Sequence, residues 1–249
     1  MRTPVMAGNW KMYKAPAETR AFFQSFLPLV QNTADREIVI CPPSINLPAA
    51  VEATQSTRVE IGAQNLYWAR EGAYTGEISG PMIQATGAKW VIIGHSERRQ
   101  YFGETDETVN RRILAALDAG LKPIVCVGEN LDQRDSGATE TVLRDQFAGG
   151  IAPLSPDQFA HIVIAYEPVW AIGTGKTATP EMANDAHRFL RAQAANKFGQ
   201  DAANAVRILY GGSVKPDNAK TLMGQAEIDG VLVGGASLDA KSFASIVNY

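Results

Sequence analysis

Short runs of apolar, often β-branched residues alternate along the chain with longer segments in which apolar positions recur at helical spacing. Near-continuous apolarity over four or five residues is typical of a strand that is covered on both faces. The pattern predicts eight such strands, at residues 5–8, 38–41, 59–63, 90–94, 123–127, 161–165, 206–210 and 230–233.

The segments between these runs carry signals for helix ends. Thr179 is a suitable N-cap, Pro180 fits the first helical position, and Gly199 can close the helix that follows. A second helix is predicted to begin after Thr105 and to stop at Gly120. Helices therefore separate consecutive strands, which is the arrangement of βαβ units.

Eight strand–helix units in 249 residues give about 31 residues per unit, which fits the length of a βαβ crossover. Such alternation predicts a parallel sheet with helices outside, and eight units can close into a (β/α)₈ TIM barrel. We predict a single α/β barrel domain over residues 1–249. The alternative is an open doubly wound sheet, but its G-x-G-x-x-G fingerprint does not follow the first strand, where the sequence reads AGNWKM.

Composition excludes several classes of function but does not indicate a particular one. Hydrophobic residues make up 45% and charged residues 20%, and the net charge of −3 with scattered Lys and Arg argues against a nucleic-acid partner. Cys41 and Cys126 form neither a disulfide framework nor a metal-binding motif, so no metal is expected. There is no signal-peptide pattern and no apolar run of about 20 residues, so we expect no membrane partner and a cytoplasmic protein.

Two Gly-Gly pairs follow the last two predicted strands. Gly211-Gly212 and Gly234-Gly235 leave the backbone free to approach an anion, and a short helix after the second pair would add a favourable dipole. A phosphate held after strands seven and eight is a recurrent barrel arrangement. The alternative is a pair of tight turns that need positive φ angles.

Ionisable residues also stand at strand ends. His95 follows the fourth run, and a helix opening beside it would favour the neutral imidazole, which can donate to a carbonyl oxygen. Glu167, between apolar neighbours, is either a catalytic base or a strand-end charge paired to a surface cation. Asn9 and Lys11 follow the first run. Alternatively, His95 only caps a helix.

The apolar, glycine-rich segment 171–175 is predicted to be a closing loop, hinged at Pro168, rather than a nucleotide-binding loop. Gly175-Lys176-Thr177 matches the end of the Walker pattern, but Trp170 occupies the position of its first glycine. The pattern therefore favours coincidence over an ATP site.

The sequence as a whole resembles the triosephosphate isomerase family. The motifs that carry the resemblance are GNWKM (8–12), IIGHSERR (92–99), AYEPVWAIGTG (165–175), YGGSV (210–214) and GVLVGGASL (230–238), and their order and spacing agree over essentially the entire chain.

This resemblance implies interconversion of dihydroxyacetone phosphate and glyceraldehyde 3-phosphate through an enediolate, with no metal and no organic cofactor. It implies catalytic roles for Glu167 as the base, neutral His95 as the electrophile and Lys11 as the cation. The base, the neutral histidine and the closing loop are known features of this family. The implied substrate-binding residues are Asn9, Lys11, Gly173, Ser213, Gly234 and Gly235. It also implies that Ile172 and Leu232 press on Glu167 when the loop closes, so that desolvation raises the pKa of the carboxyl group.

The loop from Gln64 to Gly80 is long for a compact domain and carries Tyr67, Trp68 and Tyr74. One interpretation folds it over its own barrel. The family resemblance favours insertion into a second subunit, with Thr75 near the neighbour's Asn9 and Lys11, and we therefore expect a homodimer.

Three other functions remain open. The chain could be another barrel enzyme acting on a phosphorylated sugar or an indole precursor, an ATP-binding protein, or a barrel that has lost catalysis and only binds partners. The joint presence of Asn9, Lys11, His95 and Glu167 favours the isomerase.

Overall fold

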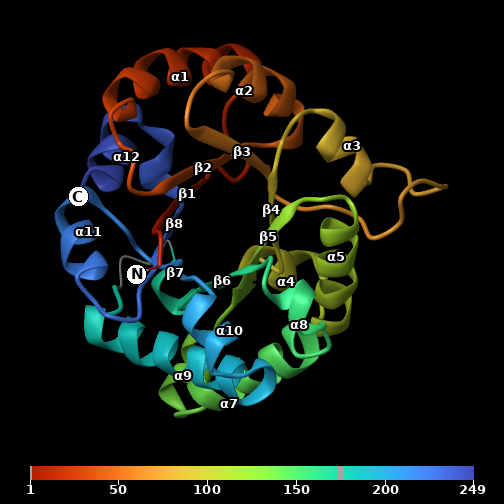
Figure 1. The fold of residues 1–249 in the computed structure, drawn as a ribbon, viewed down its shortest axis with the longest axis vertical. Helices are drawn as coiled ribbons and strands as arrows, with labels where there is room; N and C mark the ends of the chain where they lie inside the picture. Colours follow the sequence, from red (N-terminus) through yellow and green to blue (C-terminus); the bar gives the residue numbers. More distant parts are fainter. Residues whose placement is uncertain (1, 173–176) are drawn as a thin grey trace.

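Eight parallel strands form a closed barrel, as the apolar runs predict (Figure 1). The computed structural model describes residues 2–172 and 177–249. The strands are β1 (Val5–Asn9), β2 (Glu37–Cys41), β3 (Val59–Ala63), β4 (Trp90–Ile93), β5 (Lys122–Val127), β6 (Val163–Tyr166), β7 (Ile208–Tyr210) and β8 (Gly230–Val233). The α/β barrel prediction is confirmed, and the open sheet is excluded because β8 pairs with β1.

The barrel closes in register around β1. Met6 is opposite Ile38 of β2 on one side and Val231 of β8 on the other. Each strand therefore has a hydrogen-bonded neighbour on both sides, so the sheet has no open edge.

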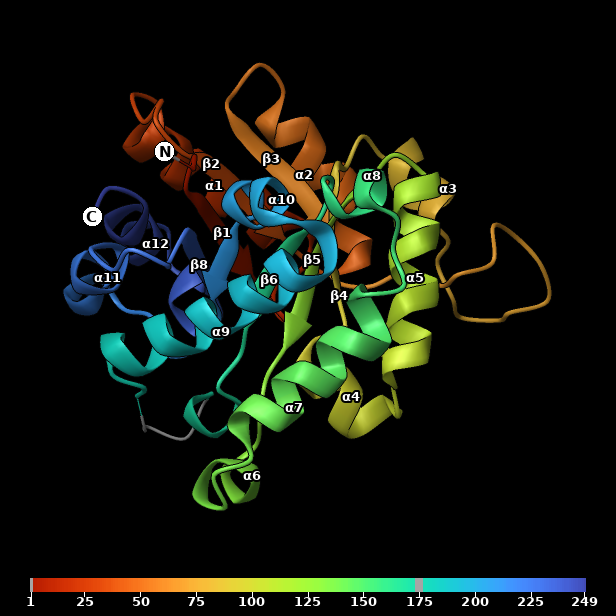
Figure 2. The same ribbon diagram turned by 60° about the horizontal axis from the view of Figure 1, so that its bottom comes forward.

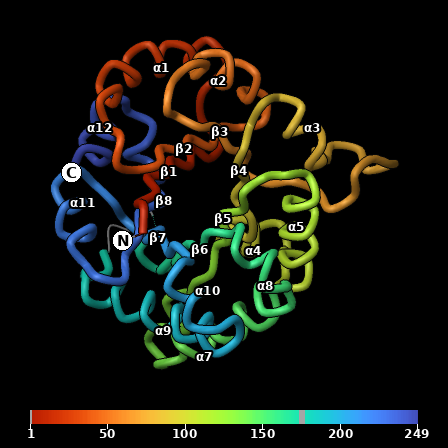
Figure 3. Tube along the Cα trace, viewed as in Figure 1, coloured from red at the N-terminus to blue at the C-terminus, as the bar shows by residue number. Residues whose placement is uncertain are grey.

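Helices surround the barrel as an outer ring (Figures 1 and 3). They are α1 (Pro16–Val30), α2 (Leu47–Thr54), α3 (Gly80–Ala85), α4 (Ser96–Phe102), α5 (Asp106–Asp118), α6 (Leu131–Asp135), α7 (Thr139–Gln146), α8 (Pro156–Phe159), α9 (Pro180–Phe198), α10 (Gln200–Ala205), α11 (Pro216–Met223) and α12 (Ala240–Val247). Shorter helical turns lie at η1 (Ser44–Asn46), η2 (Phe147–Ile151), η3 (Val169–Ala171) and η4 (Gly235–Leu238). Among the described residues, none of the helices has the length and apolarity that crossing a membrane requires.

The two helix starts predicted from capping residues are found in the structure. The Thr179 hydroxyl accepts a hydrogen bond from the Met182 N–H at 3.2 Å and caps α9, and Gly199 is the C-cap that follows the last helical residue. Thr105 caps α5 in the same way. These caps satisfy N–H groups that the first helical turn leaves without partners.

Two strands begin two residues later than predicted. His161 is exposed in a turn rather than in β6, because α8 ends just before it and the Ile162 N–H bonds back to the Phe159 carbonyl at 3.3 Å. Likewise β7 begins at Ile208 and not at Val206, because the Val206 N–H bonds to the Ala202 carbonyl at the end of α10. Apolar residues in these turns extend the run beyond the strand itself.

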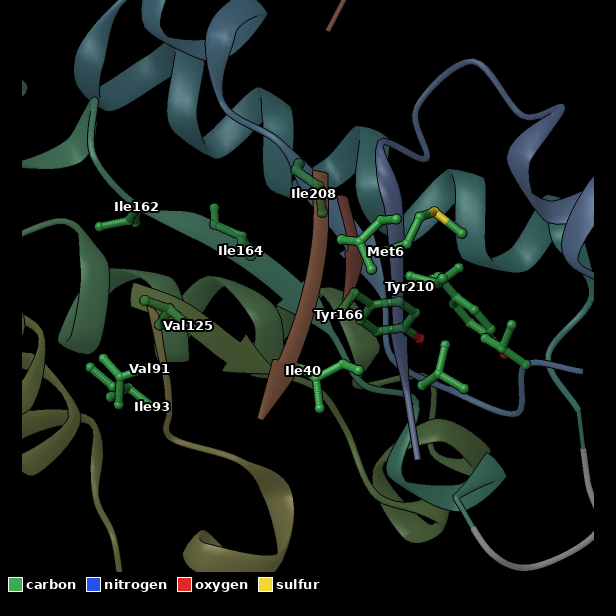
Figure 4. Packing of buried hydrophobic residues seen from close by; sticks show 14 of the residues in the cluster. Met6, Ile40, Val91, Ile93, Val125, Ile162, Ile164, Tyr166, Ile208 and Tyr210 are labelled. Atoms are coloured by element: carbon green, nitrogen blue, oxygen red, sulfur yellow. The ribbon is translucent and has the colours of Figure 1, made fainter. Parts of the chain in front are cut away.

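In every strand except β3, alternate residues belong to two separate cores. Side chains such as Met6 and Ile40 pack between the strands and the helices, together with inward faces of the helices (Figure 4). The other set fills the barrel interior: Val5, Ala7, Val39, Cys41, Trp90, Ile92, Ile124, Cys126, Val163, Ala165, Leu209 and Leu232. The barrel is therefore packed below its mouth, which confines any binding site to the strand ends.

The first and last helices close the outer ring. Phe26 of α1 stacks on Phe243 of α12 with ring centroids 5.4 Å apart. In the tilted view of Figure 2, α12 also lies beside α11, so that the C-terminal helix completes the layer around β1 and β8.

The segment between β3 and α3 projects from the ring in both ribbon views (Figures 1 and 2). Tyr67 stacks on Trp68, with ring centroids 4.2 Å apart, and contacts Tyr74 at 4.6 Å. The guanidinium of Arg112 lies 4.8 Å from the Trp68 ring. Residues 70–77 are exposed, so the tip of this arm does not fold over its own barrel.

Candidate active site

A cavity of about 400 Å³ opens at the carboxyl ends of the strands. Its walls come from the segments after β1, β4, β6, β7 and β8, which are far apart in the sequence and meet only because the barrel closes. The lining residues are Asn9, Trp10, Lys11, Tyr13, His95, Glu167, Ala171, Ile172, Gly211, Gly212, Ser213, Val214, Lys215, Leu232, Gly234, Gly235, Ala236 and Leu238. Every sequence-predicted site residue that the structure describes is in this set.

Glu167 and His95 form a buried pair across the cavity floor. The Glu167 N–H bonds to the Val127 carbonyl at 2.8 Å, which continues the sheet ladder one residue past β6 and fixes the backbone. Its Oε1 lies 2.9 Å from Nε2 of His95, and its Oε2 accepts a 2.9 Å bond from the Ser96 N–H. The carboxylate is therefore paired inside the barrel mouth and not with a surface cation.

The helix α4 fixes the tautomer of His95. The residue is the N-cap of α4, and its Nδ1 accepts the Glu97 N–H at 3.2 Å. A neutral ring whose Nδ1 accepts carries its proton on Nε2. That proton points to Glu167, so the capping role of His95 and the pairing with the carboxylate exist together.

The contact between Glu167 and His95 shifts the pKa of both side chains. Burial alone would raise the pKa of Glu167, but the interaction with His95, the Ser96 N–H and the nearby Lys11 together lower it below its usual range. Burial lowers the pKa of His95, yet the carboxylates of Glu167 and Glu97 outweigh this and raise it above its usual value. In this arrangement the two groups stabilise each other's charged forms.

Lys11 has a backbone conformation that few non-glycine residues adopt, with φ of 52°. The side chain of Asn9 accepts the Lys11 N–H at 3.0 Å, and the Gln64 side chain donates to the Lys11 carbonyl at 2.8 Å. Its ammonium lies 2.5 Å from Oε1 of Glu97. Neighbouring groups thus hold Lys11 in a strained conformation at the edge of the cavity, as is common at functional sites.

The Gly-Gly pairs are not explained by positive φ angles. None of Gly211, Gly212, Gly234 and Gly235 is among the residues with positive φ. A Cβ on Gly212 would lie 2.3 Å from the Tyr210 hydroxyl oxygen, whereas a Cβ on Gly235 would have no atom within 4 Å. The first pair is therefore needed for packing, and Gly235 leaves open space.

The second pair lies in a turn pinned by Ser237. Its N–H and hydroxyl both donate to the Gly234 carbonyl, at 2.9 and 2.7 Å. Within residues 2–172 and 177–249, no hydrogen bond is donated by the backbone N–H of Ser213 or Gly235. Unused N–H groups on two neighbouring loops are suited to an anionic ligand.

Part of the predicted site lies outside the described residues. Gly173 belongs to this part, as do Gly175 and Lys176 of the partial Walker pattern and most of the closing loop. Ile172 and Leu232, which are described, both line the cavity beside Glu167.

Three contributing residues escaped sequence reasoning. Ser96 supplies a backbone N–H to Glu167, Glu97 pairs with Lys11, and Gln64 holds the Lys11 backbone. The first two lie within the SERR motif directly after His95, which is the signal that could have found them. In the described residues, no cluster of three or more His, Cys, Asp and Glu side chains is placed to hold a metal ion.

Fold and site together define a (β/α)₈-barrel protein with a carboxylate–imidazole pair and unused backbone donors in one mouth. A family model for triosephosphate isomerase matches residues 4–249, and the chain belongs to that family of isomerases. It is similar over its full length to the triosephosphate isomerases of Solibacter usitatus (strain Ellin6076), at 70% identity, and of Citrifermentans bemidjiense, at 54%. The chain is also 51% identical to the triosephosphate isomerase of Thermoanaerobacter pseudethanolicus. These matches cover 100%, 99% and 100% of the respective relatives.

Proposed function

We propose that the chain interconverts dihydroxyacetone phosphate and glyceraldehyde 3-phosphate through an enediolate, with Glu167 as the base and neutral His95 as the electrophile. The observation that carries the proposal is the buried contact between these two groups in a cavity that also contains Lys11. Family membership supports the substrate and the reaction. Proton transfer between adjacent carbons needs a base, an oxygen-directed donor and little water, and this cavity supplies the first two.

Glu167 has to change partners during the reaction. In the structure, Oε1 and Oε2 are occupied by His95 and by the Ser96 N–H. To act, the carboxylate leaves these donors, removes the proton from one carbon of the substrate and returns it to the adjacent carbon. The same movement frees Nε2–H of His95 to donate to the substrate's carbonyl oxygen.

This movement also explains how His95 works as a neutral group. The Glu167 carboxylate is the main cause that raises the pKa of the imidazole, and its departure removes that cause. Burial and the ammonium of Lys11 then lower the pKa against the smaller effect of the Glu97 carboxylate, and Nδ1 remains engaged by the Glu97 N–H. The imidazole therefore donates from Nε2 without first becoming charged.

The remaining predicted residues bind the oxygen atoms and the phosphate group. Lys11 balances the negative charge that develops on the substrate, and Asn9 adds a hydrogen bond besides the one that holds the Lys11 backbone. Backbone N–H groups of Ser213, Gly234 and Gly235 hold the phosphate, supported by the unused donors of Ser213 and Gly235. Gly173 is proposed from the sequence alone.

Closure of the loop around residues 171–175 would exclude water from these groups. The described start of the loop supports this role: Ile172 lines the cavity, and the η3 turn before it is held by the Ala171 N–H, which bonds to the Pro168 carbonyl at 2.8 Å. Contact of Ile172 and Leu232 with Glu167 would desolvate the carboxylate and raise its pKa, which strengthens the base.

A coupled assay tests the activity directly. The purified chain is supplied with dihydroxyacetone phosphate, and glyceraldehyde 3-phosphate is measured through its oxidation by a second enzyme. We expect rapid turnover, its loss in Glu167→Gln, and full activity in Glu181→Gln, which makes the same change on α9. Absence of turnover by the parent chain would refute the proposed function.

We further infer that the chain forms a homodimer through the arm between Gln64 and Gly80. A second cavity, of about 470 Å³, adjoins the first and shares Asn9, Lys11 and His95 with it. Two large apolar side chains that line it are exposed, Met12 by 93% and Phe102 by 67%, and Tyr101, next to Phe102 in the sequence, is exposed by 68%. Such a patch beside a cavity is typical of a surface that another copy covers. The arm of the second copy, with Thr75 near its tip, would fill the second cavity.

A further inference from the structure

The charged groups of the active-site cavity are unequally available to an incoming anion. The part of its lining that the structure describes contains three acidic or basic side chains besides His95, those of Lys11, Glu167 and Lys215. The Lys11 ammonium is already 2.5 Å from Glu97, and Glu167 is itself negative. Among residues 2–172 and 177–249, no carboxylate lies within ion-pair distance of Lys215. Of the two lining lysines that the structure describes, Lys215 is therefore the one without a carboxylate partner among the described residues.

The loop after β7 holds Lys215 at a fixed place on the cavity rim. Its N–H donates to the Asn218 side-chain oxygen at 2.8 Å, and the Asn218 amide donates to the Ser213 carbonyl at 3.0 Å. These two bonds tie the start of α11 to the Ser213 backbone. Lys215 consequently lies two residues from a proposed phosphate donor, with its side chain exposed to solvent.

We propose that Lys215 is a positioning residue that attracts the dianionic phosphate of the substrate to the mouth of the cavity and raises the rate of binding. This role rests on the proposed function, in which the substrate is a phosphate monoester. Such a group carries close to two negative charges at neutral pH. The protein itself has a net charge of −3, which repels such a substrate at long range. A local positive charge at the rim offsets that repulsion where the substrate enters.

The physical consequence is a salt-dependent effect on binding and none on chemistry. Lys215 is not in contact with Glu167 or His95 in this structure, so proton transfer does not depend on it. Charges on a solvent-exposed rim act through water and are screened over about 10 Å at 0.1 M ionic strength. Removing one charge should thus matter at low salt and little at high salt.

The test compares Lys215→Gln with Lys220→Gln. Both substitutions remove one positive charge from α11 or its cap, and Lys220 is exposed but does not line the cavity. At about 10 mM ionic strength we expect kcat/KM to fall roughly two- to fivefold in Lys215→Gln and to stay near the parent value in Lys220→Gln. We expect kcat to be unchanged in both, and Lys215→Arg to restore kcat/KM.

Titration with inorganic phosphate separates this inference from the proposed function. The dissociation constant of phosphate should rise in Lys215→Gln by a similar factor, and the difference should shrink at about 0.5 M salt. Equal phosphate affinity and equal kcat/KM of the two glutamine variants at low salt would overturn the role of Lys215. A chain that binds phosphate with this pattern but does not turn over triose phosphates would refute only the isomerase proposal.

Discussion

At the scale of single residues, the Glu167 carboxylate is held by two donors, which in the proposed reaction would compete with the substrate. It is 2% exposed and bonded to both His95 and the Ser96 N–H. In the proposed reaction the carboxylate leaves these donors for the substrate. We therefore expect its reach to limit the rate of proton transfer.

Shortening the base by one methylene tests this limit. We expect Glu167→Asp to lower kcat by about a hundredfold, because a displacement of about 1 Å from the reactive geometry costs that much. KM should change far less, since the phosphate donors on the other loops are untouched. Steady-state kinetics measure both constants, and an unchanged kcat would show that Glu167 is not the base.

The pKa of His95 should depend on the charge of Glu167. Because the carboxylate raises the pKa of the imidazole, His95 in the parent protonates at a higher pH than an ordinary histidine as the pH falls. Glu167→Gln removes that charge, while burial and Lys11 still lower the pKa of His95 and only Glu97 still raises it, so protonation should shift to lower pH. NMR titration of the ring signals follows this shift.

His187 is the internal control for that titration. Burial lowers its pKa to about 3, and it lies away from the cavity lining. Its signal should not move between pH 8 and 5 in either protein. Equal titration midpoints for His95 in the parent and in Glu167→Gln would contradict the coupling of the pair.

Sequence reasoning found the residue types of the site but not all of their contacts. His95 and Glu167 could be predicted because each directly follows an apolar run, where barrel chemistry collects. The ion pair of Lys11 and Glu97 joins residues 86 positions apart, so it depends on how β1 and β4 meet in the closed barrel. No local pattern contains that information.

At the scale of elements, the turns after β7 and β8 use glycine for different reasons. Gly212 has no room for a side chain, because a Cβ would lie 2.3 Å from the Tyr210 hydroxyl oxygen and 3.1 Å from Pro168. Gly235 lines the cavity and has open space where a Cβ would lie. The sequence could not separate these cases, since both read as Gly-Gly after an apolar run.

An alanine substitution should therefore affect mainly stability in the turn after β7 and mainly substrate binding in the turn after β8. We expect Gly212→Ala to lower the free energy of unfolding by about 1–3 kcal/mol through overpacking against a buried ring. We expect Gly235→Ala to change stability by less than about 0.5 kcal/mol and to raise KM severalfold, because the methyl group crowds the phosphate. Urea unfolding and steady-state kinetics on both variants give the comparison, and a large loss of stability in Gly235→Ala would show that the glycine serves packing.

Strand positions were more predictable than strand limits. A run buried on both faces reads as continuous apolarity, which is why β1 to β5 and β8 lie within one residue of their predicted bounds. At β6 and β7 the apolar run continues into the turn before the strand, and Ile162 and Val206 are buried there without pairing in the sheet. In most of the barrel the buried apolar residues are also the residues paired in the sheet. The predicted strand bounds differ from the structure where residues are buried but not paired.

At the scale of the whole molecule, barrel closure brings two cavities together at one mouth. Asn9, Lys11 and His95 line both of them. If a second copy fills the outer cavity, it also limits the freedom of Lys11, whose backbone is already held by Gln64. Assembly and activity are then linked through the same residue.

A charge placed in the exposed apolar patch tests this link. Phe102→Glu puts a carboxylate beside the outer cavity, and in a twofold-symmetric dimer both copies would bury one, which is strongly unfavourable. We expect this variant to sediment as a chain of 26.8 kDa and to lose most of its activity at micromolar concentration. Leu29→Glu, which makes the same charge change at a side chain 44% exposed on α1, should sediment like the parent at twice that mass.

A parent chain that sediments at 26.8 kDa with full turnover would separate activity from assembly and would leave the arm between Gln64 and Gly80 without the proposed role. Recovery of activity by Phe102→Glu at high concentration, together with a shift to the larger mass, would show that the missing contact, and not a damaged barrel, causes the loss.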